Sequence, residues 1–217
     1  MRRIGLAAKV VAEWVLALLL ASALLPLLVA LACLVKLSSP GPVLYVDERV
    51  GLGGRTFRMF KFRSMFLGVQ PIVTDDDKVI VQPGDRRLTP VGRFLRLGFD
   101  ELPQLLNVLR GEMALIGPRP DAPWMLPKYT EEIRPRLQVR PGITGLAQVL
   151  RGRDLPTQDN YAIDTWYVTH WTPLIDLRIA ALTPLYIGGW RNVGQRWLAV
   201  LLPDVAAALP TDGDHRP

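Results

Sequence analysis

The chain has 217 residues, of which 49% are hydrophobic and 21% charged, and its formal net charge is +6. This length allows one domain with a core, or a smaller domain joined to a membrane element. A basic chain favours phosphate-bearing partners such as nucleic acid, an anionic membrane surface or a phosphorylated substrate, and charge alone does not choose among them. The single cysteine, Cys33, excludes an intrachain disulfide, and two histidines argue against a structural zinc site.

The first predicted element is the uncharged run from Trp14 to Val35, which is long enough to cross a hydrocarbon core of about 30 Å as a helix. It is too long for a cleaved signal peptide, and no small-residue cleavage site follows it. Basic residues flank both ends, so the positive-inside rule does not orient it. Pro26 removes a backbone hydrogen bond near the middle. Composition leaves open a spanning helix with a mild kink and a re-entrant helix that leaves the bilayer on the side it entered.

A β-hairpin is predicted next. Ser38 to Val43 (SSPGPV) is typical of a turn that ends the membrane helix. Two runs rich in Val, Tyr and Phe then flank Gly51 to Gly54, as in a hairpin. The second arm carries Arg58, Lys61 and Arg63 among aromatic residues. These cations either protect an exposed edge strand from aggregation or form a basic patch that faces phosphates or lipid headgroups.

The following stretch, Gln70 to Asp85, is predicted to be a loop. Its acidic triplet, Asp75 to Asp77, is either solvated, as most such triplets are, or binds a cation. A helix is expected to begin around Thr89 and to end at Gly98.

A second amphipathic helix is predicted from Leu102 to Arg110, because leucines recur at i, i+3, i+4 and i+7. Proline suits its first turn and Gly111 its C-terminal end. This assignment places Asp100 near the N-cap with Glu101 beside it. Helix capping and the helix dipole alone would explain such a pair, at about 1 kcal/mol.

The surroundings of the two acids suggest chemistry as well as capping. Arginines crowd the sequence on both sides of the pair: Arg86, Arg87, Arg93, Arg96, Arg110 and Arg119. Acids among arginines suggest an anionic substrate held by arginine and a divalent cation held by carboxylates, which are the usual components of phosphoryl transfer. A carboxylate can also attack phosphorus itself and form an acyl phosphate.

An ordered set of motifs covers most of the chain. It runs KLSSPGPV, ERVGLGGRTFRMFKFRSM, DRRLTPVGRFLR, FDELPQLLNVLRGEMALIGPRP, RPGITGLAQV and DLRI. From roughly Pro26 to Leu182 this order resembles the bacterial sugar transferase family, the monotopic phosphoglycosyl transferases that act on polyprenyl phosphate. The chain resembles the small members that consist of the catalytic core only.

The resemblance implies a reaction and its catalytic pair. A phospho-sugar would move from a UDP-sugar to a polyprenyl phosphate such as undecaprenyl phosphate, releasing UMP, as the first membrane step of exopolysaccharide or other glycoconjugate assembly. Asp100 would be the nucleophile that forms a covalent phospho-sugar aspartate, and Glu101 would hold Mg²⁺ next to it. Neighbouring carboxylates repel unless a cation neutralises them, and Mg²⁺ prefers a few carboxylates together with phosphate oxygens.

The resemblance also implies further substrate-binding residues. Those matching family positions are Lys61, Arg87, Arg119, Arg140, Asp164 and Asp176. The four cations would contact phosphate and nucleotide. Either aspartate would touch substrate or metal, and a structural salt bridge is the alternative for each.

The implied fold is α+β, with three parts and a position at the bacterial inner membrane. Residues 1–37 would form a re-entrant helix broken at Pro26, although Leu25 stands where the family has serine. Residues 38–190 would form a small, mainly helical cytosolic catalytic domain with a β-hairpin and interfacial amphipathic helices. Residues 191–217 would form an interfacial helix and a disordered tail, with Trp190 and Trp197 near the bilayer surface.

Three other functions would also suit a basic chain with an apolar segment. A membrane-anchored nucleic-acid binder does not explain the Asp-Glu pair, and the chain has no helix-turn-helix, RRM or finger motif. A catalytically silent adaptor of a polysaccharide assembly complex is opposed by the intact pair. A magnesium-dependent lipid-phosphate hydrolase would not need a sugar nucleotide. The sugar, the base, the glycan pathway and homo-oligomer formation stay open.

Overall fold

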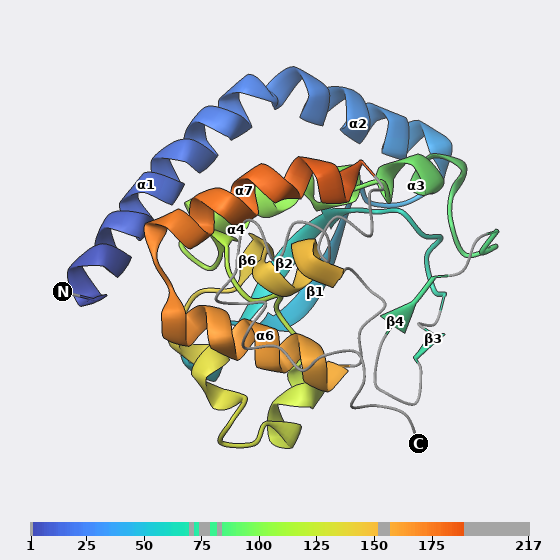
Figure 1. Cartoon of the computed structure of the whole chain (residues 1–217). Coiled ribbons are helices and arrows are strands. Elements are labelled where there is room, and N and C mark those ends of the chain that lie inside the picture. The colour runs from blue at the N-terminus through green and yellow to red at the C-terminus, as the bar shows by residue number, and fades with distance from the viewer. Residues whose placement is uncertain (1, 70–71, 74–78, 82–83, 152–156, 189–217) are drawn as a thin grey trace.

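The computed structural model describes residues 2–69, 72–73, 79–81, 84–151 and 157–188 (Figure 1). Within them the chain forms a mixed structure of helices and three two-stranded sheets, beginning with an apolar helix. This agrees with the α+β prediction at that level of detail. The acidic triplet at residues 75–77 and the predicted C-terminal segment 191–217, with Trp190 and Trp197, lie outside the described residues.

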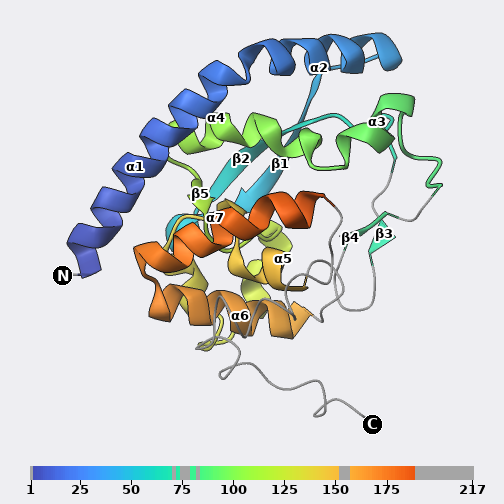
Figure 2. The same cartoon turned by 45° about the horizontal axis from the view of Figure 1, so that its top comes forward.

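Helices α1 (Arg2–Ala23) and α2 (Leu25–Ser38) form a bent arch along one side of the molecule (Figures 1 and 2). Pro26 lies in the first turn of α2, where a missing N–H is tolerated. The interruption predicted at this proline is therefore present. One stripe of the arch packs on the rest of the protein through Ala17, Leu31 and Val35, which are at most 2% exposed. The stretch Gly5–Ala23 is long and apolar enough to cross a membrane.

The predicted hairpin is present. Strand β1 (Leu44–Val50) pairs antiparallel with β2 (Thr56–Phe62), and a short 3₁₀ turn, η1 (Leu52–Gly54), joins them. Two of the turn's glycines, Gly53 and Gly54, adopt positive φ of 67° and 79°, a conformation that side chains disfavour. A smaller antiparallel pair, β3 (Ile72–Val73) and β4 (Val79–Ile80), follows.

The segment around the acidic pair differs from the prediction. Helix α3 (Pro90–Leu95) is capped by Thr89, and Gly98 follows it at a φ of 116°. A 3₁₀ segment, η2 (Phe99–Gln104), and then α4 (Leu105–Leu109) replace the single α-helix expected from Leu102. The reason is Pro103, which lacks an N–H and disfavours the α conformation at the preceding residue.

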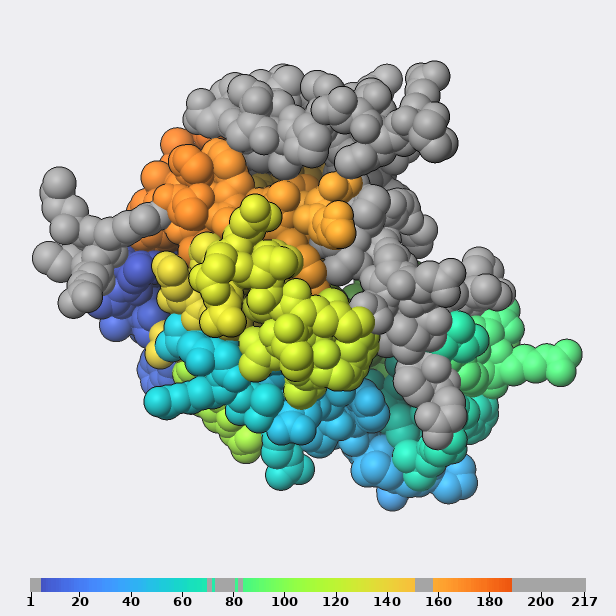
Figure 3. All heavy atoms as spheres, turned by 90° about the horizontal axis from the view of Figure 1, so that it is seen from below, coloured from blue at the N-terminus to red at the C-terminus, as the bar shows by residue number. Residues whose placement is uncertain are grey.

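The remaining elements build the main core. Parallel strands β5 (Ala114–Ile116) and β6 (Gly142–Thr144) are separated by 3₁₀ segments η3 (Pro123–Lys128) and η4 (Arg134–Gln138). Helices α5 (Leu146–Arg151), α6 (Thr157–His170) and α7 (Pro173–Ile187) then pack around Leu146, Ile163 and Ile179. Seen from below, the η3–η4 region lies between the hairpin and α6 (Figure 3).

Candidate active site

The carboxylate of Asp100 is buried next to Glu101. Asp100 is 8% exposed, and within the described part of the chain its side chain forms no hydrogen bond or ion pair. The expected N-cap role is wrong, because Gly98 precedes the 3₁₀ turn and no side chain caps it. Burial raises the pKa of Asp100; the charges of Lys61, Arg96 and Arg119 oppose the rise, and that of Glu101 adds to it. The structure therefore leaves this carboxylate available to a ligand.

The neighbouring carboxylate, Glu101, is neutralised by two cations. Its Oε1 accepts a hydrogen bond from Lys61 Nζ at 2.9 Å and another from Arg119 Nη2 at 2.9 Å. Burial opposes ionisation of Glu101, but the charges and hydrogen bonds of Arg119 and Lys61 outweigh it and hold its pKa well below the usual range. Burial also lowers the pKa of Lys61, while Glu101 and Asp100 support the charged form.

Three elements converge to build this group. Lys61 comes from β2, the acids come from η2, and Arg119 follows β5 in the sequence Gly117–Pro120. A Cβ on Gly117 would lie 2.6 Å from the carbonyl oxygen of Arg140, so only glycine allows this close approach. The backbone of Gly117–Pro120 is therefore packed closely against that of Arg140, just before Arg119 reaches Glu101.

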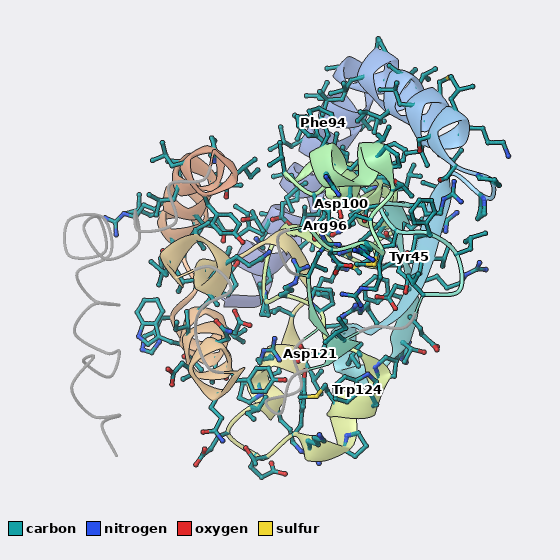
Figure 4. All side chains as sticks on the ribbon, turned by 90° about the vertical axis from the view of Figure 1, so that its right-hand side faces the viewer. Tyr45, Phe94, Arg96, Asp100, Asp121 and Trp124 are labelled. Atoms are coloured by element: carbon teal, nitrogen blue, oxygen red, sulfur yellow. The ribbon has the colours of Figure 1, made fainter. Side chains whose placement is uncertain are left out.

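Arg96 also belongs to this region. Its charge lowers the pKa of Asp100, and Figure 4 shows the two residues close together near α3, with Asp121 and Trp124 farther away. Sequence reasoning noted Arg96 only as one of several flanking arginines and did not assign it to the site. Its spacing of four residues from Asp100, with the positive-φ Gly98 between them, is the pattern that could have identified it.

Two predicted cations lie in other contacts. Arg87 Nη2 is 2.6 Å from Asp85 Oδ2, and its hydrogen bonds lower the pKa of Asp85 to about 2. Arg140 Nε donates to the carbonyl oxygen of Gly111 at 2.7 Å. Of the four predicted cations, the structure brings Lys61 and Arg119 onto Glu101.

Asp164 lies in a buried cluster around Arg136. Arg136 Nη2 is 2.9 Å from Asp164 Oδ2, and Arg136 Nη1 is 2.6 Å from Asp121 Oδ2. The guanidinium also lies over the rings of Tyr129 and Tyr161. We call these five residues the Arg136 cluster. Burial raises the pKa of Asp164 to about 6, with Arg136 opposing the rise. The cluster touches the site through its backbone, because Arg136 Nη2 donates to the carbonyl oxygen of Arg119 at 2.9 Å.

Asp176 lies where α7 meets α1. It accepts hydrogen bonds from Lys9 Nζ at 2.7 Å, Tyr167 OH at 2.7 Å and Trp171 Nε1 at 2.8 Å. For both predicted aspartates the structure thus shows an ion pair, which the sequence left as the alternative: that of Asp164 is buried and that of Asp176 is partly buried.

The acidic pair fits a cation that arrives with phosphate. The described residues contain no group of three or more His, Cys, Asp or Glu that could hold a metal. Mg²⁺ is usually bound by one or two carboxylates plus substrate phosphates, and the unbonded carboxylate of Asp100 beside Glu101 supplies such a donor set. The described residues therefore do not form a metal site built from protein ligands alone.

A family model described as "Bacterial sugar transferase" matches residues 4–188. The chain belongs to the bacterial sugar transferase family. Membership confirms the resemblance of its motifs and places the chain among transferases.

Several curated relatives support this assignment. The chain is 41% identical over 199 residues to a UDP-glucose:undecaprenyl-phosphate glucose-1-phosphate transferase of Xanthomonas campestris, covering 85% of this chain and 40% of the relative. It is 44% identical over 184 residues to a protein of the same name from Caulobacter vibrioides, covering 81% and 67%. It is 38% identical over 194 residues to the exopolysaccharide production protein ExoY of Sinorhizobium fredii, covering 84% and 86%. The chain thus spans less than half of the Xanthomonas relative and most of the Sinorhizobium one.

Proposed function

We propose that this sugar transferase moves a phospho-sugar from a UDP-sugar to undecaprenyl phosphate and releases UMP, as a first membrane step in exopolysaccharide or other glycoconjugate assembly. The observation that carries the proposal is the buried carboxylate of Asp100, which no described residue bonds, beside a Glu101 that two cations neutralise. The names of the relatives from Xanthomonas and Caulobacter supply the classes of donor and acceptor.

The proposed reaction has two displacements at one phosphorus atom. A carboxylate oxygen of Asp100 attacks the β-phosphorus of the donor, the bond to the oxygen of UMP breaks, and a phospho-sugar aspartate remains. An oxygen of the lipid phosphate then attacks the same phosphorus, which releases the aspartate and forms the polyprenyl diphosphate sugar. A covalent intermediate divides one difficult transfer into two easier ones.

The surrounding residues support both displacements. Lys61, Arg96 and Arg119 place positive charge where phosphate oxygens gain negative charge, and such preorganised groups act most strongly away from bulk water. The low exposure of Asp100 also limits the access of water, which would otherwise hydrolyse an acyl phosphate.

The remaining assignments follow from the contacts. Asp100 and Glu101 would hold Mg²⁺, which when bound neutralises charge on the diphosphate. Arg87 and Arg140 stay proposed contacts of phosphate or nucleotide. We assign Asp164 and Asp176 to structural ion pairs and not to substrate binding.

For the membrane segment we propose re-entry rather than a simple span. Both ends of the α1–α2 arch touch the catalytic domain: Lys9 Nζ is 2.7 Å from Asp176 Oδ2, and the arch continues at Ser38 into the hairpin. A spanning helix would separate these ends by a bilayer. The outward face of the α1–α2 arch is apolar, with Leu19 61% and Leu37 85% exposed. Residues 1–37 would then sit in the inner membrane, residues 38–190 would form the catalytic domain on the cytosolic face, and residues 191–217 would follow at the interface.

Cysteine labelling tests this topology. With Cys33 replaced by serine, single cysteines at Arg2 and at the exposed Pro40 are treated with a membrane-impermeant reagent in inverted and in right-side-out vesicles. Re-entry predicts that both react from the cytosolic side. Labelling of the two positions from opposite sides would establish a span.

The activity is tested by UMP release. Detergent-purified protein is supplied with undecaprenyl phosphate, Mg²⁺ and a panel of UDP-sugars, with Asp100→Asn and EDTA as controls. UMP that depends on one sugar, on the metal and on Asp100 is the expected result. Folded protein that is silent across the panel would favour the adaptor, and phosphate release without any sugar nucleotide would favour the hydrolase.

A further inference from the structure

A closed polar junction joins the membrane helix to the catalytic domain. Lys9 Nζ is 2.7 Å from both Glu13 Oε1 and Asp176 Oδ2. Glu13 Oε1 also accepts a hydrogen bond from the backbone N–H of Ile116 at 3.0 Å, and Tyr167 OH bonds both Asp176 Oδ1 at 2.7 Å and the carbonyl oxygen of Ile116 at 3.3 Å. We call these five residues the α1 junction. It draws on α1, β5, α6 and α7.

The junction gives the backbone at the end of β5 side-chain partners in addition to its pairing with β6. Ile116 is the last residue of β5, and side chains from α1 and α6 bond its N–H and its C=O. Buried backbone groups need such partners, and a strand edge without them is poorly fixed. Because Glu13 belongs to α1, the backbone N–H of Ile116 has this hydrogen-bond partner only when α1 is packed against β5.

The end of β5 leads directly to the active site. Gly117 N donates to the carbonyl oxygen of Thr144 at 2.9 Å, and the carbonyl oxygen of Pro118 accepts from Gly142 N at 2.9 Å. The next residue is Arg119, whose side chain bonds Glu101. Two residues, Gly117 and Pro118, therefore separate the backbone N–H held by Glu13 from Arg119, whose guanidinium neutralises Glu101.

We propose that Glu13 is a positioning residue. By accepting a hydrogen bond from the N–H of Ile116, it fixes the end of β5 and so orients Arg119 toward Glu101. The geometry of the active site then depends on the packing of α1 against β5. This inference rests on the proposed function for its catalytic readout. Polar side chains on a membrane helix are costly unless they are paired, and Lys9 with two carboxylates provides that pairing.

Three substitutions in the full-length chain separate this role from general packing. Glu13→Leu removes the acceptor for Ile116, whereas Glu13→Gln keeps an oxygen at the same place. Trp14→Phe is the matched control, because Trp14 Nε1 bonds the carbonyl oxygen of Leu109 at 3.0 Å, a hydrogen bond that ties α1 to α4 and not to β5. Each is combined with Arg119→Ala.

Two readouts decide the proposal. Hydrogen exchange of residues 114–117 should rise in Glu13→Leu and stay at the wild-type level in Glu13→Gln and Trp14→Phe. In UMP release, Glu13→Leu alone should lower kcat/KM roughly 10- to 100-fold, as expected for a misplaced catalytic contact. In the Arg119→Ala background it should change kcat/KM by less than about threefold, because coupled residues are not additive.

Failure of the Glu13 proposal and failure of the proposed function give different results. Unchanged exchange in Glu13→Leu would overturn the proposal, and so would fully additive losses with Arg119→Ala, since a merely structural role predicts additivity. If wild-type protein releases no UMP from any donor, the proposed function fails, and the exchange result alone still decides whether Glu13 holds β5.

Discussion

Replacing Arg136 should destabilise the domain strongly. Its side chain is 4% exposed and that of Asp164 is 3% exposed, so Arg136→Met leaves a buried carboxylate without its cation. Breaking such a pair from one side costs about 3–5 kcal/mol. With Arg136 in place, burial already raises the pKa of Asp164 from 3.8 to about 6, so removing the cation raises this pKa further.

The loss should depend on pH in a defined direction. Because the folded pKa of Asp164 lies above the unfolded one, the folded state binds the extra proton between the two values, and the free energy of unfolding rises as pH falls through that window. Without Arg136 the folded pKa is higher still. The deficit of Arg136→Met relative to wild type should therefore be largest above neutral pH and shrink as pH falls toward 6.

Urea unfolding in a mild detergent, followed by tryptophan fluorescence at pH 8 and pH 6, measures this deficit. Arg134→Met is the matched control, because Arg134 lies two residues away and pairs with Glu131 while 61% exposed; it should change stability by less than about 1 kcal/mol. A deficit for Arg136→Met under about 1 kcal/mol, or one that is equal at both pH values, would show that the ion pair with Asp164 does not stabilise the fold in this way.

Three further predictions concern the site and its support. Lys61→Met removes a charge that lowers the pKa of Asp100, so the acidic limb of the kcat/KM profile should move to higher pH; an unmoved limb would contradict this. Asn107→Ala should lower the free energy of unfolding by about 3 kcal/mol, since two backbone groups of β2 lose a buried partner; urea unfolding checks it. Gly117→Ala should abolish UMP release, because its Cβ would lie 2.6 Å from the carbonyl oxygen of Arg140; wild-type turnover would show that the segment can move.

Local chemistry made much of the fold predictable. Proline placed the break between α1 and α2, and glycines at positive φ marked the hairpin turn and the ends of α3 and α4. Each of these features depends on residues within one or two turns. The same reasoning made Asp100 an N-cap, because leucine periodicity does not reveal that Pro103 converts the first turn into a 3₁₀ segment.

The contacts of the site were less accessible because their partners are distant in sequence. Lys61 and Arg119 lie 40 and 18 residues from Glu101, and only the packing of β2, η2 and β5 brings them together. Asp176 pairs with Lys9 across 167 residues, so its role could not be distinguished from substrate binding. Glu13 borders the apolar run, and nothing in the sequence indicates that it bonds the backbone of β5.

The covalent role of Asp100 is tested most directly by single-turnover UMP release without a lipid acceptor, combined with the mass of the intact protein. We expect a burst of at most one UMP per protein and a matching mass increase of one phospho-sugar on the peptide that contains Asp100, both absent in Asp100→Asn. UMP release that requires the acceptor and leaves no adduct, or an adduct that persists in Asp100→Asn, would contradict this expectation.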